Sequence, residues 1–99
     1  MKNSDRLYCA EIYCRNIRPI YDAFRIQANC IAKRIRKNQP VCANHLADSL
    51  MLKSLARMLN RYCKQNGEPN CIEKGDMVSL ARLVIDEANE ILWEMRQAN

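Results

Sequence analysis

Apolar side chains recur along this chain at the three- and four-residue spacing of amphipathic helices, and the pattern is clearest between Pro19 and Lys37. One side of that segment is apolar and the opposite side is polar, which predicts a helix that turns one face to a core. The apolar positions are Ile20, Phe24, Ala28, Ile31 and Ile35, and the polar positions are Asp22, Arg25, Asn29, Lys33 and Arg36.

A first helix is expected before Pro19, with Ser4 or Asp5 as its cap. Its apolar positions are Leu7, Ile12, Tyr13 and Ile17. Proline removes a backbone donor and disfavours helical geometry in the preceding residue, Arg18. The helix therefore either kinks at Pro19, or ends and is followed by a second helix with Pro19 in its first turn.

A third helix is predicted from about Val41 or Asn44 to Lys64, after the break at Asn38-Gln39-Pro40. In its second half, one side is apolar, formed by Met51, Leu55, Met58, Leu59 and Tyr62. In its first half, Leu46 and Leu50 project toward the otherwise polar side of the continuous helix. That end is expected to be central in the fold or covered by a partner.

The segment Asn66-Gly67-Glu68-Pro69-Asn70 is the strongest loop signal, and Gly67 suits a helix C-terminus. Asp76 is then expected to cap a fourth helix. The inward positions predicted for this helix are Met77, Leu80, Ala81, Val84, Ala88, Ile91 and Met95.

Short connections between amphipathic helices place neighbouring helices antiparallel. We therefore expect an all-α fold in a single domain spanning residues 1–99, built as a compact antiparallel bundle of three long helices plus a kinked or separate N-terminal helix. The composition agrees, because 99 residues with 2 Gly, 3 Pro and few β-branched residues favour helices over sheets.

No apolar run approaches the length of about 18 residues that a membrane span needs. The N-terminus also lacks the apolar stretch of a secretory signal. A cytoplasmic protein that makes no membrane contact is expected.

The formal net charge of +5 is divided unevenly. Residues 1–65 carry thirteen Lys or Arg against four acids, whereas residues 66–99 carry three Lys or Arg against seven acids. A basic body suggests an anionic partner, although an acidic last helix could neutralise part of the charge internally.

The most informative feature is a cationic stripe on one side of the third predicted helix, with no acid within its span. Crowding like charges at this spacing is mildly destabilising, so a binding role is considered. Phosphate groups of nucleic acid, an acidic protein surface and a solvated helix face are all compatible with it. The stripe is Lys53, Arg57, Arg61 and Lys64, and a second basic cluster is Lys33, Arg34, Arg36 and Lys37.

Trp93 is the second feature that suggests binding. On the fourth predicted helix it falls on the side of Arg82, Asp86 and Glu90, away from the inferred core. Tryptophan is enriched in interface hot spots, and Leu83 could widen the apolar contact. The alternative is a broader core that includes Trp93.

Catalytic equipment is sparse, so no enzyme and no cofactor are expected. His45 is the only histidine, and no nucleophile motif, glycine-rich phosphate loop or paired-carboxylate pattern accompanies it. Cys42 and His45 have the spacing of half a zinc site. However, Cys42 and Cys63 would stand about 30 Å apart on one continuous helix, so they could not share an ion.

The chain has six cysteines, which in a secreted protein would indicate disulfides. Without a signal sequence, reduced structural thiols are favoured, and Cys14 and Cys30 lie among apolar residues that suit this role. No metal is expected, although one cluster could gather at one end of the bundle and bind zinc or form disulfides. That cluster is Cys9, Cys14, Cys63 and Cys71, whose spacing matches no familiar zinc motif.

These observations favour a small non-enzymatic regulator, an inhibitor or adaptor of the kind found in phages and plasmids. It would bind a larger protein or complex with an acidic surface through the cationic stripe and Trp93. Direct binding of DNA or RNA through the two basic groups is the alternative. A homodimer built on Leu46, Leu50 and the fourth helix is the third option.

Overall fold

Helices account for most of the chain in the computed structural model, which describes residues 3–98. No strand occurs within this range, so the predicted all-α class is confirmed. The elements are α1 (Asn3–Asn16), α2 (Arg18–Arg36), α3 (Ala43–Ala47), α4 (Leu50–Gln65), the short 3₁₀ turn η1 (Lys74–Asp76) and α5 (Met77–Ala98).

The break between α1 and α2 lies at Ile17, whose extended backbone has φ −98° and ψ 110°. Pro19 occupies the first turn of α2, where its missing N–H costs nothing. Of the two outcomes expected for the N-terminal region, the separate helix is therefore the one that forms.

The prediction of a single third helix is wrong, because the chain forms two helices there, α3 and α4, separated by Asp48 and Ser49. The Ser49 hydroxyl accepts a hydrogen bond from the Leu52 backbone N–H at 3.2 Å and donates one to the Leu46 carbonyl at 2.6 Å. Ser49 thus ends one helix and caps the next. The two leucines predicted to point the same way are separated, since Leu46 is 5% exposed and Leu50 is 79% exposed.

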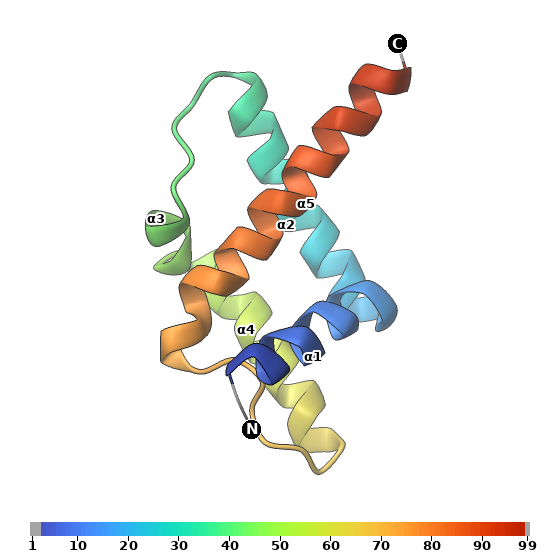
Figure 1. Cartoon of the computed structure of the whole chain (residues 1–99), viewed down its shortest axis with the longest axis vertical. Helices are drawn as coiled ribbons and strands as arrows, with labels where there is room; N and C mark the ends of the chain where they lie inside the picture. The colour runs from blue at the N-terminus through green and yellow to red at the C-terminus, as the bar shows by residue number, and fades with distance from the viewer. Residues whose placement is uncertain (1–2, 99) are drawn as a thin grey trace.

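Two left-handed residues terminate the long helices α2 and α4. Asn38 has φ 58° after α2, and Gly67 has φ 69° after α4, as expected for its role as a C-cap. After Gly67 the chain turns sharply, and the Glu68 N–H bonds back to the Cys63 carbonyl at 2.8 Å. Residues 66–73 then return along α4 instead of leaving it (Figure 1).

Helices α2 and α4 run in opposite directions. The Gln27 side chain of α2 donates to the Met51 carbonyl at the start of α4 over 2.9 Å, and Pro19 lies beside Arg61 and Tyr62 near the end of α4. Helix α5 crosses α2, and the chain runs upward in both helices in Figure 1. The two helices diverge beyond the crossing (Figure 1), and their C-terminal parts border one hollow that is lined by Ile35 and Leu92 among others.

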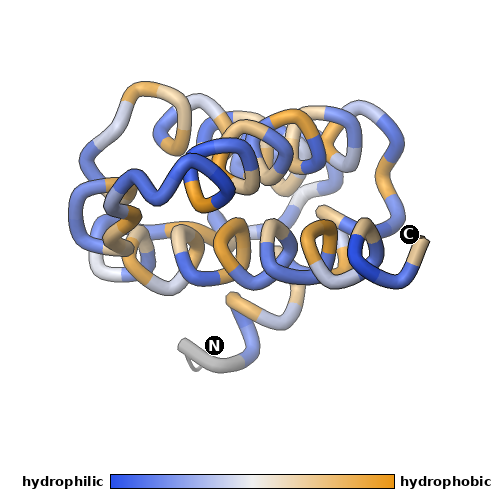
Figure 2. The backbone as a smooth tube through the Cα atoms, turned by 90° about the horizontal axis from the view of Figure 1, so that it is seen from above, coloured by the Kyte–Doolittle hydropathy of each residue, from blue (hydrophilic) through white to orange (hydrophobic). Residues whose placement is uncertain are grey.

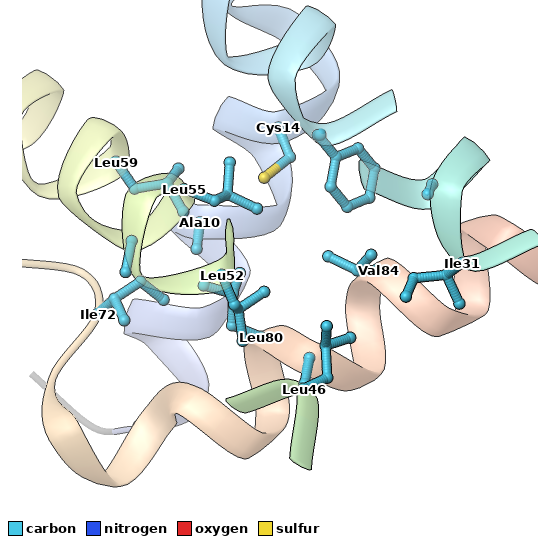
Figure 3. Close-up of a cluster of buried hydrophobic side chains, with 14 of the residues drawn as sticks. Ala10, Cys14, Ile31, Leu46, Leu52, Leu55, Leu59, Ile72, Leu80 and Val84 are labelled. Atoms are coloured by element: carbon cyan, nitrogen blue, oxygen red, sulfur yellow. The ribbon is translucent and has the colours of Figure 1, made fainter. Parts of the chain in front are cut away.

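One contiguous core joins all five α-helices of the described range, and Figure 3 shows its central part. Figure 2 shows apolar and polar residues alternating along each helix, in keeping with one buried side. Most predicted inward positions are buried or partly buried, but Met95 is 40% exposed and Leu92 is buried. The expectation of a packing role holds for Cys14, which is buried, and is wrong for Cys30, which is exposed.

No helix in residues 3–98 is long and apolar enough to cross a lipid bilayer.

Candidate functional site

The cationic stripe predicted from the sequence lies open on α4. We call it the α4 cationic face, and it consists of Lys53, Arg57, Arg61 and Lys64, which are all exposed. Within residues 3–98 none of the four forms an ion pair or a side-chain hydrogen bond. The face extends about 17 Å along the helix axis at 1.5 Å per residue.

Acids of α5 do not neutralise this face. Glu87 is buried and faces the other way, where Arg25 of α2 donates to one carboxylate oxygen at 2.7 Å and Arg15 of α1 lies 3.6 Å from the other. The remaining acids of α5, Asp86, Glu90 and Glu94, are exposed and form no ion pair with the described part of the chain. The alternative that acids of the last helix partly neutralise the stripe is therefore not what the structure shows, although Glu87 does pair with Arg15 and Arg25 of the basic body.

A shallow, open groove lies beside the α4 cationic face, between α4 and the segment that leads into α5. Its second wall is fixed by Asn60, whose side-chain amide donates to the Ile72 carbonyl at 2.8 Å and accepts from the Ile72 N–H at 3.0 Å. This pair of bonds mimics the pairing of two strands and holds the returning chain against α4. Leu50 and Met77 supply most of the accessible apolar lining, because Ile72, which also borders the groove, is only 3% exposed.

The same wall is also tied to the N-terminal helix. The Arg6 guanidinium lies 3.2 Å from the buried carboxylate of Asp76 and 3.8 Å from Glu73. Asp76 in turn accepts the Glu73 backbone N–H at 2.9 Å, which closes the capping box at the start of η1. Asp76 was predicted to be the N-cap of the fourth helix, but the N-cap is Glu73, and Asp76 is the N3 residue whose side chain closes the capping box from within η1.

The rim of this groove is predominantly positive. Lys53 and Arg57 line it from α4, and Lys74 lines it from η1. The single acid on the rim, Glu73, faces Arg6. An apolar side chain flanked by carboxylates would therefore find both an apolar lining and opposite charge in this groove.

Arg61 borders a different hollow at the far end of α4. Ile17, Pro19 and Met58 contribute its apolar lining, so the break between α1 and α2 forms one of its walls. The α4 cationic face consequently has an apolar recess near each of its ends.

Trp93 is exposed, at 60%, as its position on the helical wheel predicts. It lines a shallow hollow with Asp86, Asn89 and Glu90, so its surroundings are acidic. Figure 1 shows the C-terminal half of α5 at the opposite end of the molecule from the end of α4. The structure therefore does not unite Trp93 and the α4 cationic face into one surface.

Leu83 is half-buried, packs against the core and does not line the hollow beside Trp93. Its role in binding a partner stays a prediction.

The second basic cluster lies at the C-terminal end of α2. Lys33, Arg34, Arg36 and Lys37 are all exposed. Arg34 donates to the Pro40 carbonyl at 3.1 Å, and Arg36 borders a hollow with Arg96 at the end of α5. Cations at the last turns of two helices are favoured by the helix dipoles, so this cluster has a structural explanation of its own.

Of the four cysteines that could gather at one end, Cys63 and Cys71 share a hydrogen bond, and the described residues form no metal site. Cys14, Cys63 and Cys71 are buried, Cys9 is half-buried, and all six cysteines are free thiols. Burial raises the pKa of Cys14 to about 12, and burial together with a hydrogen bond to Cys63 raises the pKa of Cys71. Within residues 3–98, no group of three or more His, Cys, Asp or Glu side chains could hold a metal ion.

His45 lies on the surface of α3, and neither an ion pair nor a side-chain hydrogen bond engages it within the described chain. Cys42 is exposed just before α3. The distance of about 30 Å between Cys42 and Cys63 assumed one continuous helix, so it does not apply to the two separate helices.

Asn60, Ile72 and Lys74 were not singled out in the sequence, although they build the groove. Asn60 lies among the stripe residues on α4, and its polarity within a half-buried position is the one signal of its role. Ile72 follows a loop signal, and nothing in the sequence indicates that the loop doubles back along α4.

No protein-family model matches this chain, and neither does any curated protein sequence or solved structure.

Proposed function

We propose that this protein is a non-enzymatic regulator, an inhibitor or adaptor, that binds an acidic surface of a larger protein through the α4 cationic face and its adjoining groove. The observation that supports this proposal is the set of exposed cations, Lys53, Arg57, Arg61 and Lys64, which have no acidic partner in residues 3–98. Long-range charge steers the encounter, and apolar side chains seated in the groove hold the complex.

The charge arrangement itself favours a binding role. Lys53, Arg57 and Arg61 follow one another at four-residue spacing, at which like charges repel and destabilise a helix by a few tenths of a kcal/mol per pair. An acidic partner removes this repulsion on binding. A solvated helix face of the same length would be more stable with acids interspersed.

A protein partner explains one feature that nucleic acid does not. Leu50, Ile72 and Met77 place an apolar lining next to Lys53 and Arg57. A phosphate backbone would use the cations and leave this lining empty, whereas a protein segment can place an apolar side chain there and carboxylates on either side.

Binding of DNA or RNA is the second candidate, and the exposed cluster at the end of α2 favours it. Lys33, Arg36 and Lys37 border a further shallow hollow and could extend a phosphate-binding track. The mechanism would be electrostatic, with little sequence preference.

A capture experiment separates these functions. The full-length protein would be compared with a triple charge reversal, Lys53→Glu, Arg57→Glu and Arg61→Glu, in lysate of the organism that encodes it. The matched control reverses Lys33, Arg36 and Lys37, which changes the charge equally. Loss of one specific protein with the first variant and its retention with the control supports the proposal.

Equal capture by all three proteins would refute a role for the α4 cationic face. The nucleic-acid candidate is measured separately with a generic duplex and a single strand. An affinity that falls steeply with salt and is lost in both triple variants would replace the proposed function with that candidate. No binding at low salt eliminates it.

A further inference from the structure

The outward side of α5 has the opposite character to the α4 cationic face. Asp86, Glu90 and Trp93 share one side of the helix and line one hollow with Asn89. Neither Asp86 nor Glu90 has an ion-pair partner within residues 3–98. We call this surface, formed by Asp86, Asn89, Glu90 and Trp93, the α5 acidic face.

We propose that the α5 acidic face of one copy of this protein binds the α4 cationic face and groove of a second copy. The inference rests on the proposed function in one respect, because both use the α4 cationic face as a binding surface. It adds that the chain itself carries a matching partner surface.

The spacing of the two faces supports an antiparallel alignment. Along α5, Glu90 follows Asp86 by four residues and Trp93 follows Glu90 by three. Along α4 in the reverse direction, Lys53 comes four residues after Arg57, and Leu50 comes three residues after Lys53. Two antiparallel helices therefore bring three pairs into register at the same rise per residue. The pairs are Asp86 with Arg57, Glu90 with Lys53, and Trp93 with Leu50.

The apolar pair in this register consists of two unusually exposed side chains. Leu50 is 79% exposed at the mouth of the groove, and Trp93 is 60% exposed. Covering both removes apolar surface from water and places the indole beside Ile72 and Met77. The two ion pairs flank this contact and fix its direction.

The register also predicts where the favourable contact ends. One turn before Asp86, Arg82 would face Arg61, which lies one turn after Arg57. These two cations repel, so the contact is weakened at this end. Replacing Arg82 with an acid should therefore strengthen self-association, a result that a general loss or gain of solubility would not produce.

The contact is heterologous, because each copy contributes a different face. Each chain keeps its second face free, so further copies can add head to tail and the average mass continues to rise with protein concentration. Self-association also competes with binding of an acidic protein partner, since the second copy and the partner would occupy the same α4 cationic face. The α5 acidic face would thus shield the binding surface until a stronger acidic partner displaces it.

Sedimentation equilibrium on the full-length protein tests this inference. Weight-average mass would be measured from about 1 µM to about 1 mM protein, a range that detects weak association. We expect it to rise with concentration and to rise less at high salt. Trp93→Ala and Glu90→Lys should each weaken association about tenfold or more. Arg82→Glu should strengthen it, and Ile26→Ala, which removes an equally exposed side chain of α2, should not change it.

A charge exchange provides the most direct test of the register. Lys53→Glu and Glu90→Lys each weaken association alone, and the chain that carries both substitutions should recover it, because the pair forms again with reversed sign. All substitutions are at exposed positions, and circular dichroism would check that each variant is folded. A monomer at every concentration, an unaffected Trp93→Ala, or no recovery in the double variant would each overturn the inference.

The same variants separate this inference from the proposed function. Glu90→Lys and Trp93→Ala leave the α4 cationic face intact, so they should still capture the acidic protein partner. Capture by a strictly monomeric wild type would reject self-association alone. Self-association that persists while no acidic protein is captured would reject the proposed function and retain the self-association.

Discussion

Arg25 of α2 donates a hydrogen bond of 2.7 Å to Glu87 of α5 at the point where the two helices cross. The Glu87 carboxylate is 8% exposed, and Arg15 of α1 lies 3.6 Å from its second oxygen. The hydrogen bond to Glu87 raises the pKa of Arg25 above its usual value. One buried carboxylate therefore connects three helices and requires both cations to offset its desolvation.

Replacing this carboxylate should reveal how the crossing is stabilised. We expect Glu87→Ala to lower the free energy of unfolding by about 2–4 kcal/mol, because a cavity forms and the partly buried Arg25 loses its partner. Glu87→Met should lose only about 1 kcal/mol, since an apolar chain of similar volume can replace a buried ion pair. Urea unfolding followed by circular dichroism measures both.

Glu94→Ala is the control for this comparison, because Glu94 is exposed on the same helix and forms no ion pair in the described range. Its effect should stay within about 0.5 kcal/mol. If Glu87→Met were as destabilising as Glu87→Ala, the ion pair and not packing would hold the crossing.

A second prediction tests the break between α3 and α4 with two leucines four residues apart. Leu46→Ala should lower the free energy of unfolding by about 2–4 kcal/mol, because Leu46 is buried in the core. Leu50→Ala should change it by less than about 0.5 kcal/mol, because Leu50 is exposed. One continuous helix would turn both side chains to the same side, and similar losses for the two would contradict the structure. Thermal and urea unfolding measure the difference.

Each helix is predictable from the sequence to the extent that its apolar and polar positions fall on separate sides. In α2 most apolar and polar positions fall on opposite sides, and its extent and main facing are predicted from spacing alone, although Ile26 is exposed and Gln27 is buried. In α1 the fully buried residues are Ala10 and Cys14, whose small side chains give a weak apolar signal. The facing of α1 therefore depends on the helices packed around it.

The break before α4 was missed because apolar residues continue through it at helical spacing. Ser49 is compatible both with a helix interior and with a cap, and only its hydrogen bonds to Leu46 and Leu52 decide between them. The groove was missed for a related reason, since the return of the chain along α4 is fixed by Asn60 and Ile72. By contrast, helical geometry places the α4 cationic face and Trp93 on the polar sides of their helices, and the structure decides the alternatives that this left open, because both are exposed.

The buried thiols predict that the fold weakens in alkaline solution. The pKa of Cys14 is raised to about 12 in the folded protein, chiefly by burial, whereas an unfolded thiol ionises near a pKa of about 8.5. Stability from this group is complete below the unfolded pKa and is lost as pH rises toward the folded pKa, because only the unfolded chain can release the proton. The expected loss is about 1.4 kcal/mol per pH unit for each such thiol. Cys71, whose pKa is also raised, should add to the slope.

The free energy of unfolding in urea, measured between about pH 8.5 and pH 10 under reducing conditions, checks this prediction. Cys14→Ala should reduce the slope by about one proton per molecule even if it lowers stability at neutral pH. Cys42→Ser is the matched control, since Cys42 is exposed and its replacement should leave the slope unchanged. An unaltered slope in Cys14→Ala would show that the Cys14 thiol is not held in its protonated form by burial in the core.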